Sequence, residues 1–543
     1  MTRHITILLL ISIFLFLFGL GSMALTDPDE TFYAQTAKEM VQSNEWVTPT
    51  IFGEPQFEKP VLYYWLIEAS YKFFGINEFS SRLPSALFGI AGILGIYLLA
   101  RLMFSPLCGL LSGLTMVSCV QYIILSRGCV TDMVLTVFIL FALLFFLYGF
   151  SGKGKMWYLG AAVMCALAVL TKGPIGLFIP GVVIFGYLVT GRRWRQLPNI
   201  PVFWSIAVFL IVCMPWYILV TKIHGSGFID EFFGFRNITR FLEAEHRIGS
   251  SPFFYIPIIL GGVFPWTSFL LFGTWIVCKK DRFVSNISGH RLFLALWFLV
   301  VFVFFSISKT KLVTYVLPLF PVLAIVIARF WEMTIMNKLE NKTSKAMNVA
   351  YIIFVALAFI GLVASYIFAR FEYVGAAKYA LLCGGIFCAG VCLSAFLFIR
   401  GRKFLSFCAI VLSIMLIIVP VVKWVLPFVE AHESSKYLGL KVKEMAAVDE
   451  PIGGECDHRR GVAFYTDRTD IKDIHAYADL VNFMSMKKRV WAIAQDKHYE
   501  ELREQRKDLY IEVVDSSGKY VIITNKPYLS SVRGQDKLLK GGS

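Results

Sequence analysis

The fold is decided by a charged stretch that opens with Thr26-Asp27-Pro28-Asp29-Glu30-Thr31-Phe32-Tyr33-Ala34. Apolar runs lie on both sides of this stretch, which continues through the motif Phe57-Glu58-Lys59-Pro60 to Pro84. The hydrocarbon of a bilayer offers no water to charged side chains or irregular backbone, so such a stretch must lie at the membrane surface. The sequence therefore predicts a surface loop, residues 26–84, whose two motifs gather four carboxylates and a lysine.

The composition indicates a membrane protein. Hydrophobic residues make up 57% of the 543 residues and charged residues only 16%, against about 25% charged in ordinary soluble domains. Apolar runs close to the ~20 residues that a spanning helix needs recur through residue 427 and then stop. The predicted fold class is an α-helical polytopic membrane domain, residues 1–429, followed by a small soluble α/β domain, residues 430–543.

Thirteen apolar segments are predicted to span the membrane. They are residues 5–25, 85–104, 107–125, 133–150, 156–170, 174–190, 202–220, 253–278, 292–307, 312–330, 349–369, 379–399 and 404–425. The first segment also fits a secretory signal with a cleavage site at Ser22-Met23-Ala24, although its apolar part is longer than a usual signal core. Either interpretation places residues 26–84 outside the cytoplasm.

Basic residues set the orientation of these segments. Every second loop is rich in lysine and arginine, as cytoplasmic loops are: these loops carry Arg3, Arg101, Lys153, Arg192, Lys279, Arg329 and Arg400. This pattern explains much of the net charge of +15, so a nucleic-acid partner is not expected. It places residues 26–84 and the C-terminal domain together on the outer side.

Four cations in short outer loops go against the rule: Arg127, Lys172, Lys309 and Lys311. They suggest binding, although each could also anchor at the headgroups.

Asp29 is the sharpest catalytic candidate of the first motif. Asp27 at a cap, Pro28 at the first helical position and Glu30 two residues later form a capping pattern for a helix predicted to lie flat on the membrane. Capping accounts for Asp27 and Glu30 but leaves Asp29 unexplained. A carboxylate at the lip of a membrane cavity is suited to act as a general base or a metal ligand.

The remaining candidates are cations and hydroxyls that suit a phosphate. Lys59 precedes a predicted helix start at Pro60, where exposed N–H groups favour an anion, although a snorkelling pair with Glu58 is an equal alternative. Arginine donates two bonds at once to a phosphate. The candidate catalytic residues are thus Asp29, Glu30 and Asp132, and the candidate substrate-binding residues are Glu58, Lys59, Arg127, Lys172, Arg236, Arg240, Lys309 and Tyr315.

The C-terminal domain alternates short apolar runs with helical charge patterns. Residues 489–494 are predicted to form a strand, 497–504 a helix, and 509–514 with 520–523 a hairpin. Its single cysteine, Cys456, excludes a disulfide framework within the domain. No catalytic motif is present, so a packing or acceptor-side role is expected.

Several motifs in order resemble one family. They are Asp29-Glu30, Phe57-Glu58-Lys59-Pro60, Asp132, Thr171-Lys172-Gly173-Pro174, Arg240-Phe241, Phe264-Pro265-Trp266, Ser308-Lys309 and Tyr315-Val316-Leu317-Pro318. Together they look like the GT-C class of membrane glycosyltransferases. The chain is most similar to the 4-amino-4-deoxy-L-arabinose transferases that modify lipid A, relatives of the protein O-mannosyltransferases. The resemblance covers the whole chain and is densest in the first 320 residues.

The resemblance implies a function and roles for residues. It implies an inverting glycosyltransferase of the bacterial inner membrane with its active site and C-terminal domain in the periplasm. The donor would be a sugar on undecaprenyl phosphate, and the acceptor lipid A or another envelope molecule. Asp29 would be the catalytic carboxylate, and Glu58 and Asp132 would line the sugar and acceptor cavity. The lipid phosphate would be held by Lys59, Arg240 and Tyr315.

A bound divalent metal ion is possible but not firmly implied. Relatives often carry a histidine beside the position of Asn237, and this chain departs from that pattern. His246 lies nearby in the sequence and could replace it, with Glu58 as a second ligand.

Two rival functions remain. One is an enzyme of the same fold that glycosylates protein. The other is a transporter or flippase of lipid-linked sugars, which should show internal repeats and polar residues at the middle of the membrane. Neither feature is apparent in the sequence. A third interpretation, a soluble binding module on a membrane anchor, fails because an anchor does not need thirteen spans.

Overall fold

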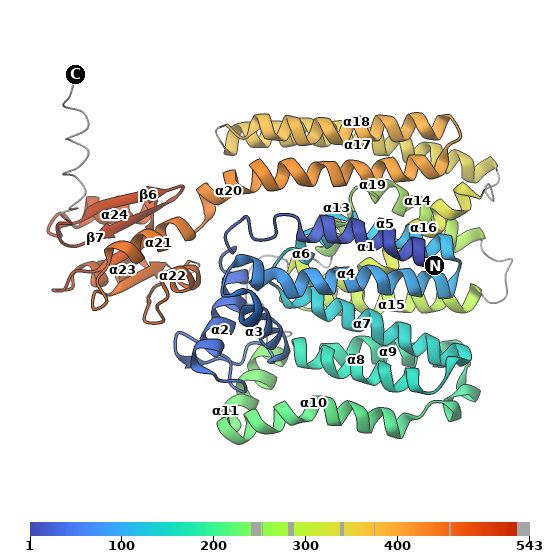
Figure 1. The fold of residues 1–543 in the computed structure, drawn as a ribbon, viewed down its shortest axis with the longest axis horizontal. Helices are drawn as coiled ribbons and strands as arrows, with labels where there is room; N and C mark the ends of the chain where they lie inside the picture. The colour runs from blue at the N-terminus through green and yellow to red at the C-terminus, as the bar shows by residue number, and fades with distance from the viewer. Residues whose placement is uncertain are drawn as a thin grey trace. The chain divides into compact units, whose positions relative to one another are not determined.

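The computed structural model describes residues 1–239, 251, 253–280, 287–336, 341–373, 375–455 and 458–528. The chain forms two compact units, each built from separate parts of the sequence (Figure 1). The membrane unit comprises Met1–Ser22, Asn44–Pro49 and Gln56–Leu426. The tail unit comprises Met23–Ser43, Thr50–Pro55 and the chain from Pro427 onward. The sequence predicts a single cut near residue 430 and gives no sign that residues 23–43 belong with the tail.

Eight helical segments in the described ranges are long and apolar enough to cross a membrane. Six are single helices: α4 (Glu78–Met103), α10 (Val202–His224), α15 (Ile287–Ile307), α17 (Asn341–Glu372), α18 (Ala377–Ile399) and α7 (Thr131–Tyr148), which η1 (Gly149–Lys153) continues. The other two are composite: η5 (Val313–Leu319) with α16 (Phe320–Ile335), and α19 (Lys403–Pro420) with η6 (Val421–Val425) and α20 (Leu426–Glu433). A polytopic helical fold is therefore confirmed.

Bends and short helices leave the predicted number of spans unconfirmed. Two helix pairs break sharply: α5 (Pro106–Val117) meets α6 (Val120–Ser126) at 69°, and α13 (Tyr255–Gly262) meets the start of α14 (Thr267–Lys280) at 110°. Three apolar helices are short: α1 (Thr2–Leu17), α8 (Met156–Lys172) and α9 (Ile175–Thr190). Counting each bent pair as one span gives up to ten, so the predicted total of thirteen is not confirmed.

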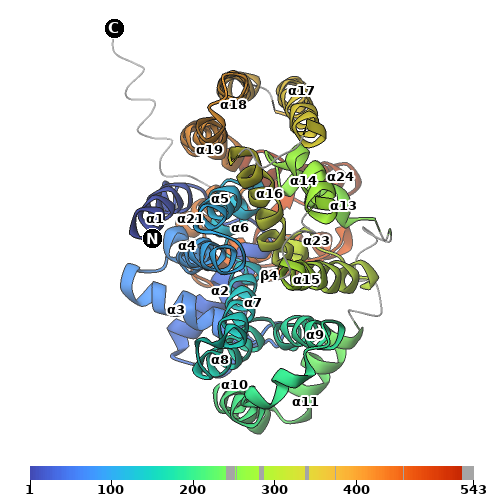
Figure 2. The same ribbon diagram turned by 90° about the vertical axis from the view of Figure 1, so that its right-hand side faces the viewer.

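The membrane helices pack in sequence-adjacent groups. Seen along the helices, α17, α18 and α19 lie side by side, and α8 lies beside both α7 and α10 (Figure 2). Helix α1 packs against α4 and α5. The shorter elements of this unit are η2 (Trp194–Asn199), α3 (Leu62–Phe74), α11 (Ser226–Ile229) and η3 (Asp230–Thr239).

The tail unit is built on a five-stranded sheet of order β4-β3-β5-β7-β6. Its strands are β3 (Ile452–Glu455), β4 (Lys472–Ile474), β5 (Trp491–Gln495), β6 (Glu512–Ser517) and β7 (Tyr520–Thr524). Strand β3 pairs in parallel with β4 and β5, and β7 pairs in antiparallel with β5 and β6. The helices are α21 (Lys436–Met445), α22 (Arg459–Thr466), α23 (Tyr477–Met484) and α24 (Asp496–Gln505). The predicted strand, helix and hairpin of this region are confirmed as β5, α24 and β6–β7.

Both faces of this sheet are covered. Along β5, Ala492 and Ala494 join one hydrophobic core, while Trp491 and Ile493 join another on the opposite face. This alternation follows from the period of two residues in a strand. A sheet covered on both faces is typical of an α/β domain, which confirms the predicted class of the soluble part.

Helix α2 (Asp29–Ser43) belongs to the tail unit, where it packs against α22. Its residues from Glu30 to Met40 are all buried. Even its polar groups are satisfied inside: Lys38 Nζ donates to Phe464 O at 2.6 Å and pairs with Asp467. Glu39 accepts from the backbone N–H groups of Phe52 and Gly53, beside the small hairpin β1 (Thr50–Ile51) and β2 (Glu54–Pro55). The prediction of an amphipathic helix lying flat on the membrane is therefore wrong, because protein surrounds α2 on most sides.

Candidate functional site

The first motif places Asp29 and Glu30 at the start of α2 with opposite surroundings. Glu30 is buried, and its Oε2 accepts from Thr26 N–H at 2.9 Å. The predicted capping pattern has Asp27 N–H as the donor to Glu30, whereas the observed donor is Thr26 N–H and the helix begins at Asp29; the bond holds the turn before the helix. Asp29 is exposed. Of the two, Asp29 is the more accessible to a substrate, and its catalytic role stays a prediction.

Asp27, which the sequence predicts as a helix cap, is buried and pairs with residues from distant parts of the chain. Its side chain is 3% exposed. Its carboxylate accepts from Thr31 Oγ1 at 2.8 Å and from Ser435 Oγ at 2.5 Å, and His458 Nδ1 lies 3.1 Å from Oδ2. Two of these partners come from residues more than 400 positions later, so no local pattern could reveal them. Asp27 thus fixes the segment that carries Asp29.

In the membrane unit, Asp132, Lys172 and Tyr315 come together from α7, α8 and η5. Lys172 Nζ lies 2.6 Å from Asp132 Oδ1 and 4.6 Å from the centre of the Tyr315 ring. Asp132 is 7% exposed, so the pair is largely removed from water. A buried ion pair costs desolvation and contributes little net stability, which makes a binding role a better reason for its presence.

Glu58, Lys59 and Arg236 form a looser group. Lys59 Nζ lies 3.6 Å and Arg236 Nη1 3.9 Å from Glu58 Oε1, beyond hydrogen-bond length. The Nε atom of Arg236 is buried and has no hydrogen-bond partner within the described residues. Arg236 Nη2 also lies 3.4 Å from Glu231 Oε1, so two carboxylates balance the two cations. The unpartnered Nε of Arg236 is the donor that suits an anion such as a phosphate.

Two other candidate cations lie apart from these groups. Arg127 donates to the backbone carbonyls of Leu15 at 3.0 Å and Phe18 at 2.9 Å, at the end of α1. A cation on the last carbonyls of a helix is a capping arrangement and gives Arg127 a structural role. Lys309 is exposed, whereas Lys311 is buried and donates to Ser308 O at 2.6 Å. Substrate contacts by Arg127 and Lys309 stay predictions.

The predicted metal site has no support in the part of the chain that the structure describes. Arg240 and His246 both lie outside the described residues. Within those residues, no group of three or more histidines, cysteines or carboxylates is arranged to hold a metal ion. Glu58, the other predicted ligand, already has two cations beside it. These donors do not fit a metal ion, so no step of the chemistry is assigned to one.

A long apolar groove runs along α8, α9 and α10. One cavity of about 750 Å³ is lined by residues that include Pro174, Tyr217 and Lys222. A second cavity of about 320 Å³ continues it toward Val202, and Leu177 and Phe209 line both. Pro174, which lines the larger cavity, lies two residues after Lys172 in the chain.

Comparisons with known proteins fit these features. Residues 58–219 match the family model described as dolichyl-phosphate-mannose-protein mannosyltransferase. The chain is 31% identical over 408 residues to undecaprenyl phosphate-alpha-4-amino-4-deoxy-L-arabinose arabinosyl transferase 1 of Proteus mirabilis (strain HI4320), covering 73% of this chain and 72% of the relative. It is also 31% identical over 338 residues to the enzyme of that name from Enterobacter sp. (strain 638), covering 60% of this chain and 59% of that protein. The chain thus spans less than two thirds of the Enterobacter relative.

The fold has a solved counterpart along its whole length. It matches the crystal structure of ArnT from Cupriavidus metallidurans bound to undecaprenyl phosphate with a TM-score of 0.81 and 22% identity, covering 98% of this chain and 99% of that one. This fold is that of the GT-C class of membrane glycosyltransferases. Within that class, the similarity to the Proteus protein places the chain in the family of the undecaprenyl phosphate-alpha-4-amino-4-deoxy-L-arabinose arabinosyl transferases. The family resemblance predicted from the motifs is confirmed.

Proposed function

We propose that the protein transfers a sugar of the aminoarabinose type from undecaprenyl phosphate to lipid A or another acceptor of the bacterial envelope. The transfer inverts the anomeric centre and takes place on the periplasmic face of the inner membrane. Family membership supports the donor class, and the alternation of basic loops supports the orientation.

The observation that carries this proposal is the apolar groove along α8, α9 and α10. A polyprenyl chain needs a long apolar surface, and the two joined cavities along α8, α9 and α10 supply one. Its phosphate needs cations near the end of that surface. Lys172, two residues before the lining residue Pro174, pairs with Asp132 beside Tyr315, and the free donor on Arg236 adds a second cation in the same unit. A lipid with an anionic head matches this combination.

Charge on the leaving phosphate is the main electrostatic demand of the reaction. As the bond from the anomeric carbon to the phosphate oxygen breaks, the electron pair stays with the phosphate. Lys59, Lys172 and Arg236 would stabilise that charge, with Arg240 and Tyr315 as further donors. Asp29 would accept the proton of the acceptor hydroxyl as its oxygen attacks from the opposite face. An acceptor that is itself a phosphate would need only orientation by Asp29.

Transfer can be measured with the purified full chain, undecaprenyl-phosphate aminoarabinose and lipid A, by mass spectrometry of the product. We expect Asp29→Asn to lower turnover about 100-fold or more while binding of the donor is kept, because a general base contributes that much. Asp449→Asn is the matched control, since Asp449 is also an exposed aspartate of the tail unit. Normal turnover of the Asp29 variant would show that Asp29 is not the general base.

The same preparation separates the rival functions. A protein O-glycosyltransferase would label envelope proteins and leave lipid A unmodified. A flippase would move the intact lipid-linked sugar across vesicles without releasing undecaprenyl phosphate. Release of undecaprenyl phosphate that depends on added lipid A supports the proposal against both.

A further inference from the structure

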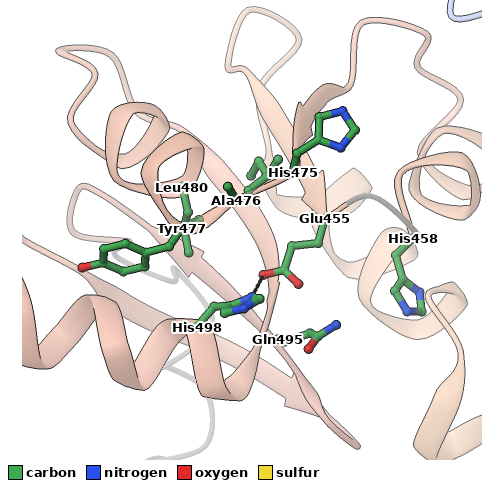
Figure 3. A pocket seen from close by; sticks show the side chains of 9 residues that line it. Glu455, His458, His475, Ala476, Tyr477, Leu480, Gln495 and His498 are labelled. Carbon is green, nitrogen blue, oxygen red and sulfur yellow. Dashed lines mark hydrogen bonds and ion pairs between the residues drawn. The ribbon is translucent and has the colours of Figure 1, made fainter. Parts of the chain in front are cut away.

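The tail unit contains a small polar pocket that the proposed transfer reaction does not use. The pocket has a volume of about 160 Å³, and its lining includes Glu455, Ile474, His475, Leu480, Gln495 and His498 (Figure 3). By liquid volume this is room for about five water molecules, which is the scale of one monosaccharide rather than of a lipid.

The position of the pocket follows from the topology of the sheet. Glu455 ends β3, His475 follows the end of β4, and Gln495 ends β5. Because β3 is parallel to both neighbours, these three ends meet at one edge. The chain leaves β3 toward β4 on one side and then returns to β5 on the other, so the strand order reverses beside β3. In open α/β sheets, such a reversal at the carboxyl ends is the place where ligands bind.

Each histidine of the pocket is paired with a carboxylate. His498 Nδ1 lies 2.8 Å from Glu455 Oε1, and the dashed line in Figure 3 marks this bond. His475 Nε2 lies 3.0 Å from Asp473 Oδ2. His458 reaches Asp27, as described above. Because Nδ1 of His498 faces Glu455, Nε2 is the ring nitrogen left for a ligand.

The charges around the pocket favour a hydrogen-bond donor over an anion. Among the described lining residues, Glu455 is the carboxylate; Asp473, the partner of His475 just outside the lining, also pairs with Arg459 at 3.1 Å. Glu455 is 7% exposed, and its side chain pairs with His498. Desolvated carboxylates repel phosphate and attract ammonium and hydroxyl groups. A metal ion is not favoured, because the described residues offer no suitable group of three ligands.

We propose that this pocket is a saccharide-binding site that accepts one amino-sugar residue. The amine lies against Glu455, and the ring hydroxyls donate to Gln495 and His498. Ile474 and Leu480 form its apolar side. The site is independent of the transfer reaction, so it would bind sugar even if the proposed donor or acceptor were wrong.

Ligand-observed NMR on the full chain in nanodiscs tests the charge argument with three probes of equal ring size. We expect D-glucosamine to bind with a dissociation constant in the millimolar range, D-glucose about tenfold more weakly, and glucose 6-phosphate more weakly still. No binding of any probe would overturn the proposal. Glucose 6-phosphate as the tightest ligand would also overturn it, because the pocket would then be an anion site.

Two variants localise the binding. Glu455→Gln keeps the shape of the side chain and should weaken glucosamine at least tenfold while removing its advantage over glucose. Glu504→Gln, an exposed glutamate on α24 that does not line the pocket, is the matched control and should bind as the parent does. If Glu455→Gln lowers the unfolding temperature, Gln495→Ala replaces it, since Gln495 lines the pocket, is proposed to contact the sugar and is only half-buried. Unchanged binding in a folded pocket variant would place the sugar elsewhere and refute the proposal.

Discussion

At the scale of single residues, Asp27 and Asp29 lie two positions apart but differ in burial and in hydrogen bonding. Asp29 is exposed, and Asp27 is buried with three hydrogen-bond partners. A buried carboxylate with every partner in place stabilises its surroundings, and its removal leaves those partners unsatisfied. We therefore regard Asp27 as a positioning residue for Asp29.

Asp27→Ala should destabilise the tail unit by about 2–4 kcal/mol, because Thr31, Ser435 and His458 lose their acceptor. Thermal unfolding of the purified protein measures this effect, with Asp449→Ala as the exposed control. Equal unfolding temperatures for the two variants would contradict a structural role for Asp27.

Glu68 on α3 predicts a dependence of stability on pH. Its side chain is 1% exposed, and burial raises the pKa of its carboxyl from 4.5 to about 7. Between these values the folded state holds more protons than the unfolded state, so stability falls as pH rises from about 4.5 to about 7. Glu68→Gln should therefore raise stability at pH 8, by up to about 3 kcal/mol, and change it little at pH 4.5.

Unfolding temperatures at pH 4.5, 6 and 8 measure this difference. Glu54→Gln, at an exposed position, is the control and should show no such trend. A Glu68→Gln variant that is stabilised equally at all three pH values would show that charge is not the cause.

At the scale of elements, periodicity and composition predicted most of the structure. All thirteen apolar segments correspond to helices or bent helix pairs, and the strand, helix and hairpin of the tail lie where the alternation of side chains placed them. The bends near residues 118 and 264 were missed, because hydropathy reports how apolar a segment is and not its direction. The burial of α2 was missed because its covering partners lie more than 400 residues away. The sequence predicts Lys172 and Asp132 as separate candidates and gives no sign that they form an ion pair.

The ends of α7 and α8 provide a test that separates binding from stability. Lys172→Met should lower stability, because it leaves the buried Asp132 carboxylate without its cation, and should also weaken binding of undecaprenyl phosphate. Adding Asp132→Asn should restore the unfolding temperature without restoring the binding. Thermal unfolding and a lipid-binding titration on both variants measure the two effects. Recovery of binding together with stability would show that Lys172 acts only through the fold.

At the scale of the whole molecule, the tail unit is discontinuous in sequence, since it takes in residues 23–43. The bond from Leu25 N–H to Tyr465 Oη joins residues 440 positions apart. A unit whose two hydrophobic cores share one sheet is expected to unfold cooperatively, whatever the separation of its parts in the sequence.

Trp491→Ala removes a fully buried side chain from the sheet and should cost about 3–5 kcal/mol. Hydrogen exchange should then accelerate in α2 as well as in β3 and β5, while α7 in the membrane unit keeps its protection. Tyr510→Ala, at an aromatic residue that is 51% exposed, is the control and should leave hydrogen exchange in α2, β3, β5 and α7 unchanged. Unchanged protection of α2 in the Trp491 variant would show that α2 folds separately from the sheet.

The long separation between α2 and its partners also sets an order of events during synthesis. Residues 23–43 leave the ribosome early, yet the surface that receives them is made only once residues 427–528 have been translated. Until then the nascent chain carries Asp29 on a segment with no folded support. On the role proposed for Asp29, we expect a chain that ends before the tail to be inert and activity to begin only when translation has passed the tail.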